Sequence, residues 1–136
     1  MRFDFVLLAD AAQVLEGKLY IQGGGLTRLT APTVPWMQPL AICMRLESVD
    51  DDDLSRDWQF EVAVFGPDEN VLAEHRTPIA LHRPDMAIAE GEQAGVVLLA
   101  LTLSGLVVHS YGPHKVRVAI DGAEEELRFA VVPPEA

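Results

Sequence analysis

The sequence has only one cysteine, Cys43, so no disulfide can form within its 136 residues. Small secreted domains usually depend on disulfides, and a single thiol therefore favours a reducing compartment. Long apolar runs are also missing. The longest, residues 96–103, has eight residues, where a membrane-spanning helix needs about 20. Asp4 and Asp10 flank the one stretch that resembles the apolar core of a signal peptide. We therefore expect a cytoplasmic protein.

Positive charge is scarce as well. Ten Lys and Arg residues stand against 21 Asp and Glu residues, which gives a formal net charge of -11. Nucleic acids and anionic membranes bind clusters of Lys and Arg, and the ten here are scattered along the chain. We expect neither as a partner. A hydrophobic fraction of 49% over this length is enough to form a core. The chain is therefore predicted to be a single domain over residues 1–136.

No long helical period occurs, whereas an alternation of period two recurs along the chain. Residues 58–65 place Trp58, Phe60, Val62 and Val64 on one face, as in a half-buried β-strand. Residues 114–120 and 124–131 alternate in the same way. Asp121-Gly122 lies between them, a pair that accepts the positive φ angles of a tight hairpin turn. We therefore predict a hairpin at this end of the chain, ended by two prolines.

The remaining segments complete a prediction of eight or nine short strands with turns at regular spacing. Residues 96–103, apolar on both faces, are predicted to form a central strand covered on both sides. Residues 11–17 are predicted as a loop or short helical turn, 77–95 as irregular, and 86–90 as at most one helical turn. The fold class is all-β, an antiparallel two-sheet sandwich, Ig-like or jelly-roll-like. The predicted strands are 3–10, 18–22, 26–30, 40–49, 58–65, 71–76, 96–103, 114–120 and 124–131.

Two N-terminal motifs, Leu7-Leu8-Ala9-Asp10-Ala11-Ala12 and Gly17-Lys18-Leu19-Tyr20-Ile21-Gln22-Gly23-Gly24-Gly25, resemble a family of small uncharacterised bacterial proteins. The similarity extends to a Gly-Pro turn at 112–113, an alternating strand and an Asp-Gly hairpin. The resemblance implies a compact β-sandwich of unassigned function, with no catalytic residue to carry over.

The triple glycine at 23–25 is a candidate phosphate cradle. That use requires a helix after the loop, whose amides hold the anion. Residues 26–30 are instead predicted as a strand, and no Gly-Lys-Ser/Thr ending follows. A backbone role, in a bulge or a close crossing, is therefore favoured.

An acidic segment supplies the only metal candidates, Asp50, Asp52, Asp53 and Asp57. Clustered carboxylate oxygens suit Ca²⁺. Consecutive aspartates, however, point in different directions, which favours a solvated charge run over a chelating loop. Both interpretations remain open.

The other reactive side chains form no recognisable constellation. The four histidines lack zinc-ligand spacing, although His109 and His114 can meet across the turn between them. Cys43 lies in an apolar strand and is predicted to be buried. Trp58 is expected in the core and Trp36 at a surface contact. We expect no cofactor. The remaining histidines are His75 and His82.

These observations lead to two functional hypotheses. The first is a non-catalytic interaction or structural module that self-associates or docks a protein partner, because sandwiches leave strand edges and residues 32–39 look exposed. The alternative is a small-ligand or Ca²⁺ binder that uses loops 50–57 and 77–95. An enzyme is disfavoured because no nucleophile, base and orienting group can be assembled. Carboxylates that are distant in sequence can still meet in the fold, so an enzyme is not excluded.

Overall fold

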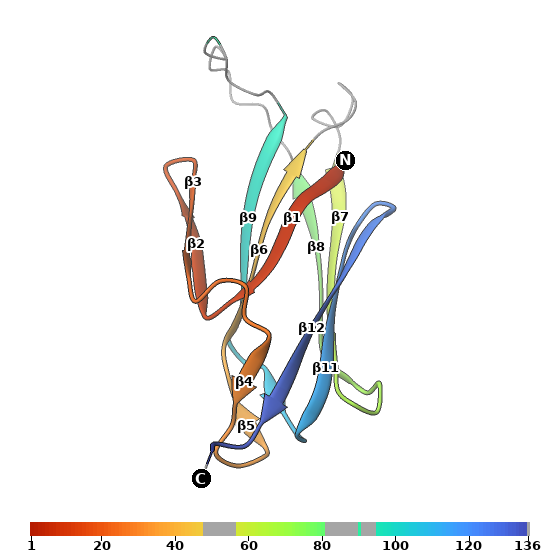
Figure 1. Ribbon diagram of the computed structural model, residues 1–136. Coiled ribbons are helices and arrows are strands. Elements are labelled where there is room, and N and C mark those ends of the chain that lie inside the picture. Colours follow the sequence, from red (N-terminus) through yellow and green to blue (C-terminus); the bar gives the residue numbers. More distant parts are fainter. Residues whose placement is uncertain (48–56, 81–89, 91–94, 136) are drawn as a thin grey trace.

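The computed structural model describes residues 1–47, 57–80, 90 and 95–135. This part of the chain contains strands and no helix, so it has no helix that could span a membrane. Two sheets face each other (Figure 1). The three-stranded sheet has the order β1-β6-β9 and the five-stranded sheet the order β4-β12-β11-β7-β8. Their strands are β1 (Arg2–Ala9), β6 (Leu40–Glu47), β9 (Val96–Leu103), β4 (Arg28–Thr30), β12 (Ala123–Val132), β11 (Gly112–Ile120), β7 (Asp57–Phe65) and β8 (Val71–Ala80).

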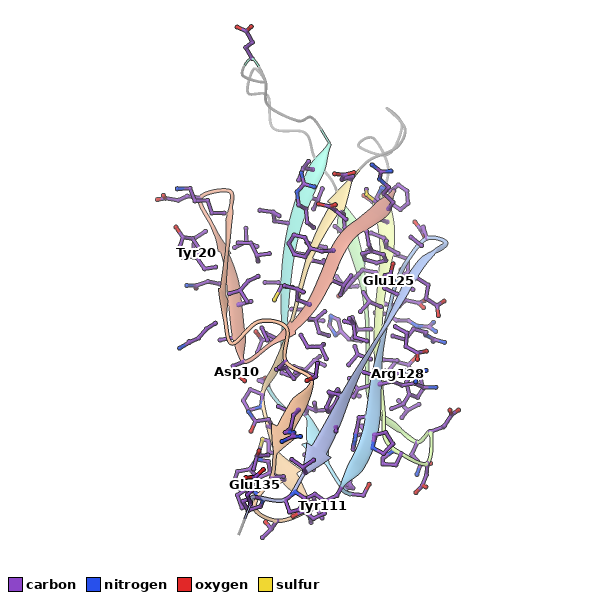
Figure 2. All side chains as sticks on the ribbon, in the orientation of Figure 1. Asp10, Tyr20, Tyr111, Glu125, Arg128 and Glu135 are labelled. Carbon is purple, nitrogen blue, oxygen red and sulfur yellow. The ribbon has the colours of Figure 1, made fainter. Side chains whose placement is uncertain are left out.

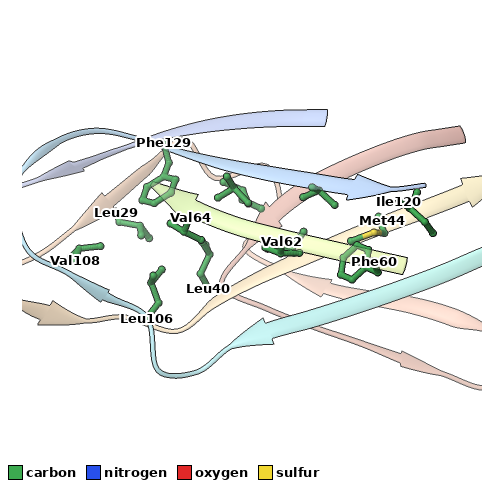
Figure 3. Packing of buried hydrophobic residues seen from close by; sticks show 14 of the residues in the cluster. Leu29, Leu40, Met44, Phe60, Val62, Val64, Leu106, Val108, Ile120 and Phe129 are labelled. Atoms are coloured by element: carbon green, nitrogen blue, oxygen red, sulfur yellow. The ribbon is translucent and has the colours of Figure 1, made fainter. Parts of the chain in front are cut away.

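The core fills the space between these two sheets (Figure 3). Leu40, Ile42 and Met44 of β6 are fully buried. They belong to the same cluster as Phe60 and Val62 of β7. Successive side chains of a strand point to opposite faces, so every second residue faces the core and the residues between them face outward. The alternation in the sequence therefore corresponds to this difference in burial. The all-β sandwich prediction is confirmed, and so is the burial of Trp58.

The C-terminal hairpin forms as predicted. β11 and β12 pair antiparallel from Gly112 opposite Val131 to Ile120 opposite Ala123, without a break in register. The turn residues Asp121 and Gly122 both have positive φ, 31° and 92°. Such a turn matches the right-handed twist of its flanking strands, and the Asp-Gly pair tolerates the required angles.

The prediction for residues 11–17 is wrong. Residues Ala11–Leu15 form the strand β2, which pairs antiparallel with β3 (Lys18–Gln22). The two-residue turn Glu16-Gly17 has φ of 51° and 73°, which are the angles of a tight hairpin turn. We call this hairpin, residues 11–22, the arm. It extends along the three-stranded sheet, on the side away from the five-stranded sheet (Figure 1).

Two other predictions need correction. β9 is an edge strand rather than a central one, since in the described part it pairs with β6 alone. Its residues are half-buried except for the exposed Thr102, with the core on one side and β2 of the arm close by. Residues 77–80 are not irregular but continue β8 past Pro78. The proline is tolerated because β8 is also an edge, where a missing N–H breaks no ladder.

The described residues contain twelve strands rather than eight or nine. The additional strands are β2 and the two-residue pair β5 (Trp36–Met37) and β10 (Val107–Val108). One pair is parallel rather than antiparallel, because β4 lies alongside β12 in the same direction. The helical turn predicted at 86–90 lies almost wholly outside the described residues.

Candidate interaction surface

Exposed apolar side chains concentrate on the arm. Of the seven large hydrophobic residues that are exposed in the described part of the chain, four belong to β2 and β3. Leu15 and Tyr20 have half of their surface exposed, and Val14 and Ile21 have 38%. Tyr20 points away from the sandwich (Figure 2). The remaining three are scattered: Met37, Val71 and Tyr111. The arm is therefore the principal apolar feature of the described surface.

The two faces of the arm have different surroundings. Ala12 and Leu19 pack against a small cluster on the outer face of the three-stranded sheet, formed by Ala9, Ala41 and Cys43. In the strand register Ala12 is opposite Ile21 and Leu19 is opposite Val14, so Val14 and Ile21 share this seated face. Gln13, Leu15 and Tyr20 lie on the other face. A surface depression of about 390 Å³ runs along the arm, and its lining includes Tyr20 and Ile21. One face thus seats the arm on the sandwich while the other remains available.

The base of the arm is tied down by backbone hydrogen bonds. The Asp10 amide donates to the Gln22 carbonyl at 3.0 Å, and the Gly25 amide donates to the Leu8 carbonyl at 2.8 Å. Gly23 has φ of 65°, and a Cβ there would overlap the Asp10 carboxylate. Gly23 therefore permits the close approach of its backbone to Asp10, which is a backbone role as predicted.

The arm carries no net charge, in contrast to the chain as a whole. Its only charged residues are Glu16 and Lys18, one of each sign, whereas the protein has a formal net charge of -11. A neutral apolar patch within an acidic surface can approach another protein without local repulsion. Sequence reasoning missed this surface. The available signal was the glycine at position 17 between two short segments that contain apolar residues, because glycine accepts the positive φ of a hairpin turn.

The predicted metal candidates are not brought together in the described structure. Asp50, Asp52 and Asp53 lie outside the described residues, and Asp57 is an exposed residue at the start of β7. No group of three or more His, Cys, Asp or Glu side chains suited to a metal ion occurs in the part of the chain that the structure describes.

The histidines occupy separate environments. His75 is exposed on β8, where its Nε2 lies 2.9 Å from the hydroxyl oxygen of Thr77. His109 is exposed and His114 is 97% buried, but both line one surface depression of about 390 Å³ beside the turn at residues 66–70. The two residues share this depression, and neither belongs to a group of three metal-ligating side chains among the described residues. His82 lies outside that part of the chain.

Cys43 is fully buried in β6, as predicted. Burial raises the pKa of its thiol, so the side chain stays protonated at neutral pH and is a poor nucleophile. The prediction for Trp36 is wrong in part. This residue is half-buried and packs against the core, with its indole N–H donating to Gln38 Oε1 at 3.3 Å. Its neighbour Met37 is the exposed one.

Two cations gather over one aromatic ring on the outer face of the five-stranded sheet. Lys115 Nζ lies 5.3 Å and Arg117 Cζ 5.8 Å from the centre of the Phe65 ring. Lys115 also faces Arg128 across the hairpin. Glu69 pairs with Lys115 at 3.1 Å and Glu126 pairs with Arg128 at 3.2 Å. These carboxylates offset most of the local positive charge, so the cluster is not a strong anion site.

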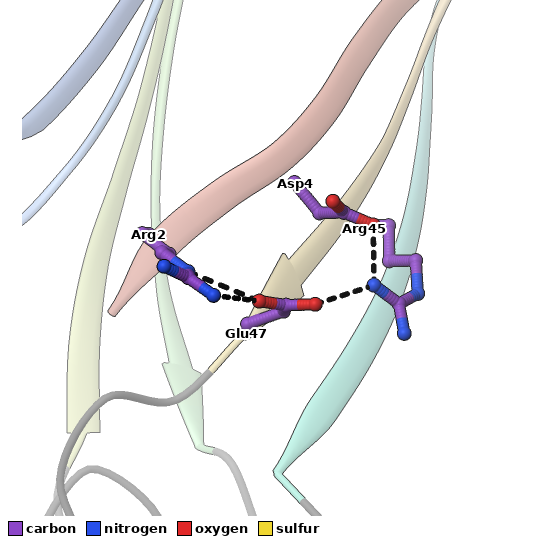
Figure 4. A network of polar contacts seen from close by, with 4 residues as sticks. All are labelled: Arg2, Asp4, Arg45 and Glu47. Atoms are coloured by element: carbon purple, nitrogen blue, oxygen red, sulfur yellow. Dashed lines mark hydrogen bonds and ion pairs between the residues drawn. The ribbon is translucent and has the colours of Figure 1, made fainter. Parts of the chain in front are cut away.

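A network of charged side chains fastens β1 to β6 on the outer face of the three-stranded sheet (Figure 4). Glu47, with 12% of its side chain exposed, accepts from Arg2 at 2.6 Å and from Arg45 at 2.7 Å. Arg45 also donates to Asp4. Hydrogen bonds to Glu47 and then Asp4 raise the pKa of Arg45 above its ordinary value. The network is satisfied internally and is therefore structural rather than a binding site.

The comparisons with known proteins identify a family. A model of a family of unknown function, DUF6941, matches residues 4–132. The chain therefore belongs to that family. No curated protein and no solved structure gives a match. Since no function comes from the family, any proposal must come from the surface of the molecule itself.

Proposed function

We propose that this protein is a non-catalytic interaction module that docks a protein partner, which can be a second copy of itself, through the exposed face of the arm. The observation that carries the proposal is the exposure of Leu15 and Tyr20, each with half of its surface exposed, on the face of the arm that does not pack on the sandwich. Large exposed side chains held on one face of a fixed hairpin are candidate anchors for a protein interface. Tyr20 is the type of residue that dominates such contacts, because its ring is large and its hydroxyl can bond at the rim.

Three properties of the arm support this function. Its base is fixed by backbone hydrogen bonds, so little conformational entropy is lost when a partner binds. It carries no net charge within an acidic protein. Its seated face packs on the sandwich through Ala12 and Leu19, so the exposed face is presented in a defined orientation. We further propose that it acts in the bacterial cytoplasm, on the strength of the family resemblance and the single buried thiol.

Site-specific photo-cross-linking tests the proposal. A photoreactive phenylalanine analogue in place of Tyr20, in the full chain expressed in cells, is expected to give a discrete adduct whose partner mass spectrometry identifies. The same analogue at Val71, which is 56% exposed on β8, is the matched control and should give none. Titration of the identified partner, or of a second copy, should then show binding at least about tenfold weaker for Leu15→Ser, since each exposed anchor contributes on the order of 1 kcal/mol or more. Equal adducts from positions 20 and 71 would contradict the role of the arm.

The alternative of a Ca²⁺ site has one described candidate ligand, Asp57. Titration with millimolar Ca²⁺ should leave the thermal midpoint unchanged if the protein acts only as an interaction module. A rise of several degrees would favour the alternative, because a ligand that binds only the native state stabilises it.

A further inference from the structure

A surface depression lies at the end of the sandwich where β7 turns into β8 and β11 begins (Figure 1). It is the depression of about 390 Å³ that His109 and His114 line. Its walls come from two segments, the turn that leads into β8 at residues 66–72 and the residues 109–114. The arm contributes nothing to these walls, so a site here is independent of the interaction function proposed for the arm.

The turn that forms one wall is held in a fixed position. The Gly66 amide donates to the Asn70 carbonyl and the Glu69 amide donates to the Gly66 carbonyl, both at 3.0 Å. The Glu69 carboxylate also pairs with Lys115 of β11 at 3.1 Å, which ties the turn to the strand behind it. A depression with fixed walls loses little conformational entropy when a ligand binds.

His114 brings a buried hydrogen-bond acceptor to the depression. The residue is 97% buried, and its Nδ1 lies 3.0 Å from the Gly112 carbonyl oxygen. A carbonyl oxygen only accepts, so Nδ1 carries the proton and Nε2 is left as an acceptor. Nε2 has no hydrogen-bond partner in the described structure. Buried acceptors without a partner are rare in native proteins, and departures of this kind concentrate at functional sites.

The rest of the lining favours a positively charged ligand that donates hydrogen bonds. Asp68 supplies a carboxylate, and no Lys or Arg belongs to the lining among the described residues. The formal net charge of -11 attracts cations over a longer range. A metal ion does not fit, because the described residues contain no group of three or more side chains suited to one. An organic ammonium ion combines the required charge with the required donors.

We propose that this depression binds a small primary amine. The ammonium group donates to His114 Nε2, and the Asp68 carboxylate compensates its charge. The hydrocarbon part of the amine contacts Pro67 and Leu72, two apolar residues of the wall. Nε2 has almost no surface open to solvent in the free protein. The exposed side chains of the lining therefore rearrange as the amine enters, a change of rotamer that is common on binding.

Nitrogen-15 NMR of the full chain with labelled histidine tests the site, with butylamine as the probe. The titration is done at about pH 8, above the ordinary histidine pKa of about 6.5, where the amine is still charged. The His114 Nε2 resonance is expected to shift saturably, in about the millimolar range for so small a ligand. Butyrate should leave it unchanged, and butanol should bind at least about tenfold more weakly because it lacks the charge.

Three variants separate the site from a general effect of charge. His114→Phe keeps an aromatic ring against Phe129 and removes Nε2. Its affinity for butylamine, followed through the resonances of His109, should fall at least about tenfold. Asp68→Asn, at an exposed position where folding is not at risk, should weaken binding about three- to tenfold. Glu124→Gln changes the net charge equally, near the other end of the C-terminal hairpin, and should leave the affinity unchanged.

Several results would overturn the proposal. A shift of Nε2 with butyrate in place of butylamine would exclude an amine as the ligand. Binding of butylamine that leaves the Nε2 resonance unmoved, or that His114→Phe retains, would exclude this depression as the site. An Nε2 that is already hydrogen-bonded and does not respond to any probe would assign the atom to a bound water. None of these results would alter the photo-cross-linking test at position 20, which decides the role of the arm separately.

Discussion

The imidazole of His114 stacks on the ring of Phe129, with 5.2 Å between the ring centres and 26° between the planes. The two residues are direct cross-strand partners in the C-terminal hairpin. His114 Nδ1 lies 3.0 Å from the Gly112 carbonyl oxygen, which can only accept, so Nδ1 carries the proton. Nε2 is then a buried acceptor that has no hydrogen-bond partner in the described structure. Burying this acceptor without a hydrogen bond in an otherwise apolar core lowers the stability of the fold.

The first prediction follows from that buried nitrogen. His114→Phe removes the unsatisfied acceptor and keeps a ring against Phe129, at the cost of one hydrogen bond to Gly112. We expect the free energy of unfolding to stay within about 1 kcal/mol of the wild type, because the two effects are similar in size. His114→Ala leaves a cavity as well and should cost about 2–5 kcal/mol. Urea denaturation of both variants measures these values, and equal losses would contradict this account of Nε2.

The second prediction concerns the thiol of Cys43. Burial raises its pKa, so the folded protein retains this proton to a higher pH than the unfolded chain, whose thiol ionises near about 8.5. Stability from this group is therefore present below that pH and is lost as the pH rises further. Cys43→Ala should have a flatter dependence of unfolding free energy on pH above about 8.5 than the wild type has. Equal slopes for the two proteins would show that the thiol ionises alike in both states.

Reagent accessibility offers an independent measurement on the same residue. A thiol-specific reagent should modify native Cys43 much more slowly than the denatured chain, because the side chain is fully buried and protonated. Rapid modification of the native protein would mean that β6 opens locally.

The third prediction concerns Glu47, which accepts hydrogen bonds from both Arg2 and Arg45. Glu47→Gln removes the negative charge that accepts from both guanidinium groups, while Asp4 still accepts from Arg45. We expect a loss of about 1–3 kcal/mol, the range for hydrogen bonds to charged groups. Glu126→Gln is the matched control, because its partner Arg128 is 84% exposed, and should cost less than about 1 kcal/mol. Denaturant unfolding of both variants measures these free energies. Similar losses of stability for Glu47→Gln and Glu126→Gln would contradict the larger contribution that we assign to the network.

The sequence predicted the strands whose residues alternate clearly, and it missed those whose pattern is ambiguous. Residues 58–65 and the hairpin about Asp121-Gly122 were predictable because one face is apolar and the other polar. Ala11–Leu15 was missed because alanine has a low strand propensity and the polar and apolar residues of this segment do not alternate. Pro78 suggested the end of a strand, although an edge strand tolerates it.

The position of a strand within a sheet was the information that the sequence did not contain. The apolar run 96–103 is compatible with a central strand and with an edge strand, and only its pairing with distant residues separates the two. The apolar exposure of Leu15 and Tyr20 depended in the same way on where the hairpin packs. The candidate surface could therefore be identified only from the tertiary structure. The acidic segment around Asp57 could be identified from the sequence alone.

The parallel pairing of β4 with β12 has a consequence for how the protein is made. β12 lies inside the five-stranded sheet, between β4 and β11, yet it follows every other described strand in the sequence. Until β12 has been synthesised, β4 has no neighbour in that sheet and β11 lacks one of its two strand partners. The five-stranded sheet therefore cannot be completed strand by strand in the order of synthesis. The apolar strands made before β12, β9 among them, are the segments that a nascent-chain chaperone would need to shield.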